Sequence, residues 1–221
     1  MRRHAIVPLL ALAVLSGCTT GQSGTPTAIS TTATRTQDST PGSESSEPSI
    51  TSTSAADLPS DGAPKVENPM DVSKFVNDPC ASLPPRRTQE LVGAPTGTPS
   101  DDVTGVSCQW VNHSPDTFNG SSINVHFFSK VPTGLSGLYR ANKRGEWEFF
   151  EPLSPIEGMP AVTYGKLDSR SSGRCAVAVG VSDTMAIDVH TKQSLSKTNR
   201  DQACSVAVMV ATDVVKTLKA G

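Results

Sequence analysis

Two polar residues on one expected strand, Asp188 and His190, have the types and the spacing for acid–base chemistry. Side chains two positions apart on a strand point to the same face, so the carboxylate of Asp188 can orient the imidazole of His190. A histidine held in this way acts as a general base near neutral pH. We favour the plainer interpretation, in which the two residues form an ordinary polar pair on an exposed sheet face.

A tryptophan among glutamates is the next candidate for a binding contact. Trp147 has a glutamate on each side and follows the basic residues 143–144 closely. An aromatic ring in such a setting can line a groove for a protein partner or a glycan, although a core position under a helix at residues 134–144 is the favoured structural interpretation. The candidate ligand contacts are therefore Trp147, Asp188 and His190, and the sequence assigns no catalytic, cofactor-binding or metal-binding residue.

The first cysteine, Cys18, stands where a signal peptidase would leave a new N-terminus. Two arginines precede the apolar residues 5–15. This run is shorter than the roughly 20 residues of a membrane span and fits the apolar part of a signal peptide. Residues 15–18, Leu-Ser-Gly-Cys, resemble a bacterial lipobox. We expect residues 1–17 to be cleaved and Cys18 to carry lipid, rather than being a chance cysteine after an ordinary secretory signal.

The segment after Cys18 has the composition of a tether. Ser and Thr make up 21 of the 49 residues 19–67, together with five Pro, four Gly and no aromatic residue. Such a chain buries too little apolar surface to offset the entropy of ordering it. We expect residues 18–67 to be a disordered tether with a typical reach of roughly 35–42 Å. Its composition also permits O-glycosylation, but a plain spacer is the favoured interpretation.

Residues 68–221 have the length of one domain with a single core. The formal charge of this region is balanced, with 15 Lys and Arg against 15 Asp and Glu. A chain that binds nucleic acid usually carries a basic patch, and no such run of residues stands out here. We therefore expect no nucleic-acid partner.

Four cysteines remain in this domain once Cys18 is assigned to lipid: Cys80, Cys108, Cys175 and Cys204. An even number in an exported protein indicates two disulfides, for which three pairings are possible. We favour Cys80 with Cys108 and Cys175 with Cys204, because nearest neighbours close loops of about 30 residues. A zinc site is the disfavoured alternative, since there is no C-x-x-C pair and no histidine at ligand spacing.

Hydrophobic periodicity predicts a strand-rich domain. Strands are expected at residues 107–111, 123–127, 146–150, 175–181 and 185–190, the last two joined as an antiparallel hairpin through the turn at 182–184. Helices are expected at residues 83–93 and 134–144 and, most clearly, through residues 203–218, where apolar residues recur at helical spacing. The expected fold class is α+β, a mostly antiparallel sheet with the C-terminal helix packed on one face.

The order of the motifs carries a resemblance to a known family. In sequence come the lipobox, the Ser/Thr-rich tether, Asn-Asp-Pro-Cys at 77–80, Cys-Gln-Trp at 108–110, Gly-Met-Pro-Ala at 158–161, a cysteine opening the hairpin and a cysteine in the terminal helix. This order resembles the actinobacterial lipoproteins grouped as domain of unknown function 3558. Residues 82–86, Ser-Leu-Pro-Pro-Arg, depart from the Leu-Thr-Pro-Glu opening usual there, which puts the start of that helix in doubt. The resemblance implies an exported, mostly antiparallel α+β domain and no particular activity.

Two hypotheses about function follow. In the first, the chain is a non-enzymatic binding or scaffolding module on the extracytoplasmic face of the cell membrane, anchored through lipid on Cys18 and facing an envelope protein, lipid or glycan. In the second, it is an envelope enzyme or enzyme accessory whose site is assembled from scattered polar residues. A deep, mostly apolar pocket with converging polar groups would favour the second hypothesis, and a flat polar face the first. Neither requires a cofactor.

Replacing the expected lipid-bearing residue tests the anchor directly. The variant Cys18→Ala should leave the membrane fraction or remain unprocessed, because the thiol is the group to which the lipid is attached and two or more acyl chains make membrane binding stable. Membrane partition and the mass of the intact protein are the measurements. If both were unchanged in the variant, the assignment of Cys18 would be wrong.

Overall fold

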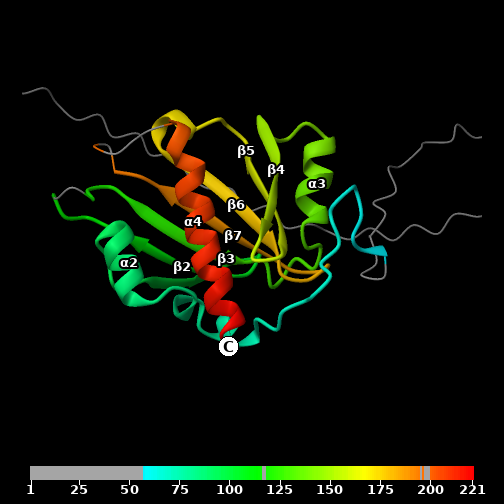
Figure 1. Ribbon diagram of the computed structural model, residues 1–221, viewed down its shortest axis with the longest axis horizontal. Helices are drawn as coiled ribbons and strands as arrows, with labels where there is room; N and C mark the ends of the chain where they lie inside the picture. The colour runs from blue at the N-terminus through cyan, green and yellow to red at the C-terminus, as the bar shows by residue number, and fades with distance from the viewer. Residues whose placement is uncertain (1–56, 116–117, 195, 197–199) are drawn as a thin grey trace, which may run out of the picture. The chain divides into compact units, whose positions relative to one another are not determined.

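The computed structural model describes residues 57–115, 118–194, 196 and 200–221. The expected signal peptide, Cys18 and the tether up to residue 56 therefore lie outside the described residues. The described part is built around a seven-stranded sheet (Figure 1). None of the helices in this part of the chain combines the length and the apolar character that crossing a membrane requires.

Every neighbouring pair of strands in the sheet is antiparallel. The order across the sheet is β1-β2-β3-β7-β6-β5-β4, so the chain builds one side first, crosses to the far edge and returns to the middle. In chain order the strands are β1 Thr98–Asp101, β2 Val106–Val111, β3 Ser122–Phe127, β4 Phe149–Ile156, β5 Met159–Gly165, β6 Arg174–Gly180 and β7 Ala186–Lys192. The expected α+β class and antiparallel hairpin are confirmed.

The C-terminal helix α4, Arg200–Lys219, covers one face of the sheet (Figure 1). Val177 and Val179 of β6 and Val189 of β7 have no exposed surface. They belong to the same core cluster as the apolar side of α4, for example Ala207 and Val210. Fully burying one such aliphatic side chain contributes roughly 1.5–3 kcal/mol. The helical spacing seen in the sequence thus marks the side of α4 that packs into the larger of the two buried clusters.

Two disulfides connect helical segments to the sheet, in the pairing favoured from the sequence. Cys80 in the 3₁₀ helix η2, Pro79–Ser82, is bonded to Cys108 of β2, and Cys175 of β6 is bonded to Cys204 of α4. The partners are 28 and 29 residues apart in the chain. In the chain-entropy account each bridge of this length stabilises the fold by roughly 3–4 kcal/mol.

The shorter helices follow the sequence closely. Helix α2, Pro85–Val92, begins directly after Pro84 and ends at Gly93, whose φ of 68° is left-handed and suits glycine. The helix expected at residues 83–93 is therefore present, and its start, which the sequence left in doubt, is at Pro85. Helix α3 is Ser136–Lys143, as expected, and the structure adds α1, Ser73–Asn77, and the 3₁₀ helix η3, Arg170–Ser172.

The strand expected at residues 146–150 is wrong in position. Strand β4 begins only at Phe149 and continues to Ile156, through Pro152 and Pro155. Proline cannot donate to a strand ladder, so its presence argues against a central strand; β4 tolerates it because it lies at the sheet edge. Residues 146–148 instead connect α3 to β4, and this is where Trp147 lies.

Part of the expected tether is packed on the domain. Val66 is buried in the core, and its N–H donates to Oδ1 of Asp183 at 2.8 Å. Nearby, Asp61 forms an ion pair with Arg140 of α3 at 2.9 Å. Composition assigned these residues to the tether because it cannot detect bonds to partners about 80–117 positions away in the sequence. The ordered domain therefore includes residues before 68.

Candidate functional site

The sheet face opposite α4 is covered over only part of its width. Helix α3 and the segment before it pack over β5 and β6 through Leu135 and Leu138. Ala176 and Ala178 of β6 have small side chains at this contact, so the ring of Tyr164 fits beside them. On this face, no helix of the described residues packs over β1, β2, β3 and the adjacent side of β7. We call this uncovered region the open half-face.

Strand register brings the polar residues of the open half-face into rows. One row runs from Gln109 through Asn124 and His190 to Ala176 and Tyr164. The neighbouring row contains Ser107, His126 and Asp188, followed by Ala178. Each row changes from polar to apolar between β7 and β6, where the cover provided by α3 begins.

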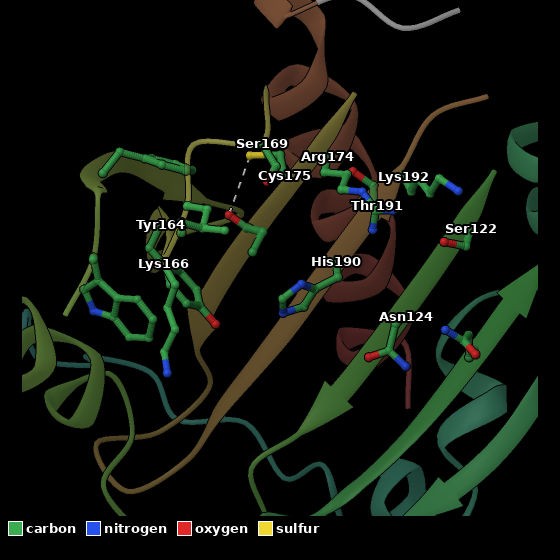
Figure 2. A pocket seen from close by; sticks show the side chains of 16 residues that line it. Ser122, Asn124, Tyr164, Lys166, Ser169, Arg174, Cys175, His190, Thr191 and Lys192 are labelled. Carbon is green, nitrogen blue, oxygen red and sulfur yellow. Dashed lines mark hydrogen bonds between the residues drawn. The ribbon is translucent and has the colours of Figure 1, made fainter. Parts of the chain in front are cut away.

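Two adjoining hollows lie on this face, the first at the boundary and the second over the open half-face. The first has a volume of about 640 Å³ and is bordered by Trp147 and Tyr164 on one side and by Asn124 on the other. The second, of about 450 Å³, lies over Ser107, His126 and Asp188. Gln109, Asn124 and His190 border both, so we treat the hollows as one groove. Figure 2 shows His190 between Tyr164 and Asn124.

A buried carboxylate holds the floor of the groove together. Oδ2 of Asp188 accepts hydrogen bonds from the Tyr164 hydroxyl at 2.8 Å and from Nε2 of His190 at 2.6 Å. Only 5% of the Asp188 side chain is exposed, against 54% for His190. The other oxygen, Oδ1, is buried and has no hydrogen-bond partner among the described residues. The carboxylate of Asp188 is thus bound by two hydrogen-bond donors, the Tyr164 hydroxyl and the His190 ring, and the His190 ring is exposed to the groove.

Electrostatics in this network favour a protonated His190. The negative charge of Asp188 is the main reason that the pKa of His190 is raised above its ordinary value, and burial opposes this shift. The pKa of Tyr164 is raised well above its ordinary value, first by burial and then by the charge of Asp188. Tyr164 therefore remains a neutral hydrogen-bond donor, and His190 presents a cationic ring to the groove over a wider pH range than a free histidine.

Trp147 is both packed under helix α3 and part of the groove lining, the two alternatives considered from the sequence. Its Nε1 donates to the carbonyl oxygen of Leu138 in α3 at 3.0 Å, which fixes the indole under the helix. Its ring meets Tyr164 edge to face, with 4.8 Å between centroids, and still borders the first hollow. A ring held this rigidly can contact a ligand at little cost in conformational entropy.

The structure brings all three candidate contacts to one groove, although 41 positions separate Trp147 from Asp188 in the chain. The expectation that Asp188 is exposed is wrong, because Tyr164 and His190 bond to its carboxylate in a nearly solvent-free position. Sequence reasoning missed Tyr164; the alternation within β5, which puts it on the same face as Val162, was the available signal. Among the described residues no group of three or more His, Cys, Asp or Glu side chains is placed to hold a metal ion.

The fold and the groove define a class of small, disulfide-bonded α+β domains with one helix-covered and one half-open sheet face. The model of a family described as "Protein of unknown function (DUF3558)" matches residues 13–217, and the chain belongs to this family. Comparison with curated proteins and with solved structures gave no match.

Removing the charge of Asp188 should lower the pKa of His190. In Asp188→Asn the main cause of the raised value is gone and burial, which acts in the opposite direction, remains. An NMR titration of the His190 ring in both proteins measures the difference. Asp213→Asn, which removes a carboxylate paired with Arg87 instead, is the control and should leave that titration unchanged.

The same pair gives a pH-dependent part of stability. Because the pKa of His190 is higher in the folded chain than in the unfolded one, this contribution is complete below about pH 6.5 and is lost as the pH rises through the raised value. Denaturant unfolding at a series of pH values should show this loss in the wild type and not in Asp188→Asn. The pairing of His190 with Asp188 would be contradicted if the His190 ring titrated at the same pH in Asp188→Asn as in the wild type.

Proposed function

We propose that the chain is a lipid-anchored binding module of the cell envelope and that the groove on the open half-face is its ligand site. The observation that supports this most strongly is the meeting of Trp147, Gln109 and His190, from separate parts of the chain, around one groove. Aromatic surface with a few fixed polar groups is the usual composition of a ligand site. The disulfides and the core fix the sheet that carries Gln109 and His190.

Support for the anchor comes from the N-terminal sequence. Cys18 follows a cationic, an apolar and then a small-residue segment in that order. The family match begins at residue 13 and so includes Cys18. In this proposal lipid on Cys18 holds the protein at the outer face of the membrane, and the tether places the groove within a few tens of ångströms of it. An envelope protein, lipid or glycan is then the partner class within reach.

The geometry favours binding over catalysis. Asp188 is committed to Tyr164 and His190, so its charge stabilises the floor of the site and is not presented to a substrate. The groove is open to solvent along a sheet face and is bordered by amide, hydroxyl, amine, imidazole, carboxylate and aromatic groups. This arrangement contacts an extended ligand along its length but does not enclose a reacting group from water, as most active sites do.

A catalytic role for His190 is the second candidate. The observation in its favour is the 2.6 Å hydrogen bond to Asp188, which orients the imidazole and raises its pKa. In this reading Nδ1 would exchange a proton with a bound substrate. His190→Gln would then abolish turnover while leaving ligand occupancy of the groove intact, an outcome that separates catalysis from binding.

Site-specific crosslinking in the cells that produce the chain tests the binding proposal. A photoreactive amino acid replaces Gln109, an exposed residue that borders both hollows. We expect this position to give a defined adduct in the membrane fraction, identified by mass spectrometry. The matched control carries the same group at Gln89, which is exposed on α2 and borders neither hollow.

The comparison between the two positions decides the result. A ligand seated in the groove reacts at position 109 and not at position 89. Adducts that are the same at both positions, or none at position 109, would contradict a binding site in the groove.

A further inference from the structure

In the described part of the domain, the unpaired Lys and Arg side chains lie at one place. Among the Lys and Arg side chains that the structure describes, only Lys166, Arg174 and Lys192 lack an ion pair or hydrogen bond within the chain. All three border the first hollow.

The other described cations are engaged. Most reach a carboxylate, as Arg87 does with Asp213 at 2.6 Å. Lys74 and Lys219 donate to backbone carbonyl oxygens instead. Most of the described cations have an intramolecular partner. The three that have none all border a single hollow, so the unpaired charge is a specific feature of that hollow.

The hollow contains no group that would neutralise these cations. No Asp or Glu is among the described residues that border it. His190 is paired with Asp188 at 2.6 Å, so this pair adds no net charge to the hollow. The positive groups therefore reinforce one another, and an anion in this hollow would gain attraction from each of them.

The cations come from both sides of the hollow. Arg174 and Lys192 are register partners at the ends of β6 and β7. Lys166 follows β5, and Figure 2 shows it on the Tyr164 side of His190, with Lys192 on the other side. Cations that approach the hollow from two sides fit a ligand that carries more than one anionic group.

The groups between the cations indicate what joins those anionic groups. Gln109, Asn124 and Ser122 offer neutral donors and acceptors, and Trp147 offers a rigid aromatic edge. Amides and hydroxyls beside an aromatic ring suit the hydroxyl groups and the apolar C–H faces of sugar rings. A lipid acyl chain would need an enclosed apolar cavity, whereas this hollow is open and lined by many polar groups.

We propose that the first hollow binds an acidic saccharide chain, with its phosphate or carboxylate groups held by Lys166, Arg174 and Lys192 and its sugar rings lying over Asn124 and beside Trp147. This inference rests on the proposed function, since it names the ligand class of the same groove. The balanced charge of the whole domain argues against a general polyanion surface, because attraction is confined to this one hollow.

Calorimetric titration of the full-length protein with defined probes tests the ligand class. Hexagalacturonate and pentamannosyl phosphate supply carboxylate and phosphate saccharides, and maltohexaose is the neutral saccharide. A hexaglutamate peptide and phosphatidylglycerol vesicles represent acidic ligands of other classes. We expect at least one acidic saccharide to bind, more weakly as salt is raised, and maltohexaose to bind much more weakly.

Charge variants locate the binding. The triple variant Lys166→Gln, Arg174→Gln and Lys192→Gln should weaken the acidic saccharide about tenfold or more, because each exposed ion pair contributes a factor of roughly two to five.

The matched control variant removes three charges elsewhere, through Lys65→Gln, Arg86→Gln and Lys216→Gln. None of these residues borders the hollow, so the affinity should change little. Equal losses in both triple variants would overturn the proposal, as would the absence of binding by both acidic saccharides or tighter binding of the peptide or the vesicles.

The outcome separates this inference from the proposed function. If crosslinking from position 109 gives its specific adduct but the hollow's charge variant retains full affinity for its ligand, the groove is a binding site and the acidic-saccharide assignment is wrong. If neither experiment gives a specific result, the proposed function itself fails.

Discussion

Burial of the branched side chains of β6 and β7 under α4 is the interaction on which the rest of the domain depends. Val177, Val179 and Val189 are removed from water on this face. Because a strand alternates its side chains, the same alignment sends the intervening residues to the other face. A shift of one residue would exchange the core and the groove. The hydrophobic core thus fixes where Asp188 and His190 point, and the floor of the groove follows from it.

On the opposite face of the sheet a groove forms because α3 and the residues around it cover only part of that face. Alanines on β6 admit Tyr164 and the elements packed around it, and this layer stops at β7. Asp188 lies at that boundary. A buried carboxylate is strongly destabilising unless donors surround it, and its two donors are Tyr164 and His190. The carboxylate of Asp188 therefore links Tyr164, on the covered half of the face, to His190, on the open half, and restricts the positions of these two side chains.

Much of the architecture could be predicted from the sequence because it rests on local patterns. Alternation located β7 and helical spacing located α4. The even number of cysteines left after Cys18 indicated two disulfides, and the preference for nearest neighbours gave the pairing that the structure confirms. The two edge strands, β1 and β4, were harder to predict from the sequence. Strand β1 is exposed at every position and β4 contains prolines, so neither shows the alternation of a half-buried strand. The packing of Val66 and the burial of Asp188 depend on partners distant in the chain, which no local pattern records.

The same limit explains why the cations around the groove were not recognised in the sequence. Lys166, Arg174 and Lys192 differ from the other described Lys and Arg side chains in lacking a partner within the chain. Such partners are distant in sequence, as Arg87 and Asp213 are, 126 residues apart.

Balanced net charge also concealed them. Several carboxylates satisfy backbone N–H groups instead of cations, as Asp102 does for Thr104 and Gly105 and Asp183 does for Val66. A carboxylate used in this way leaves a cation elsewhere without a partner. A domain with equal numbers of both charges can therefore still present a localised positive surface, and recognition depends on that distribution and not on the sum.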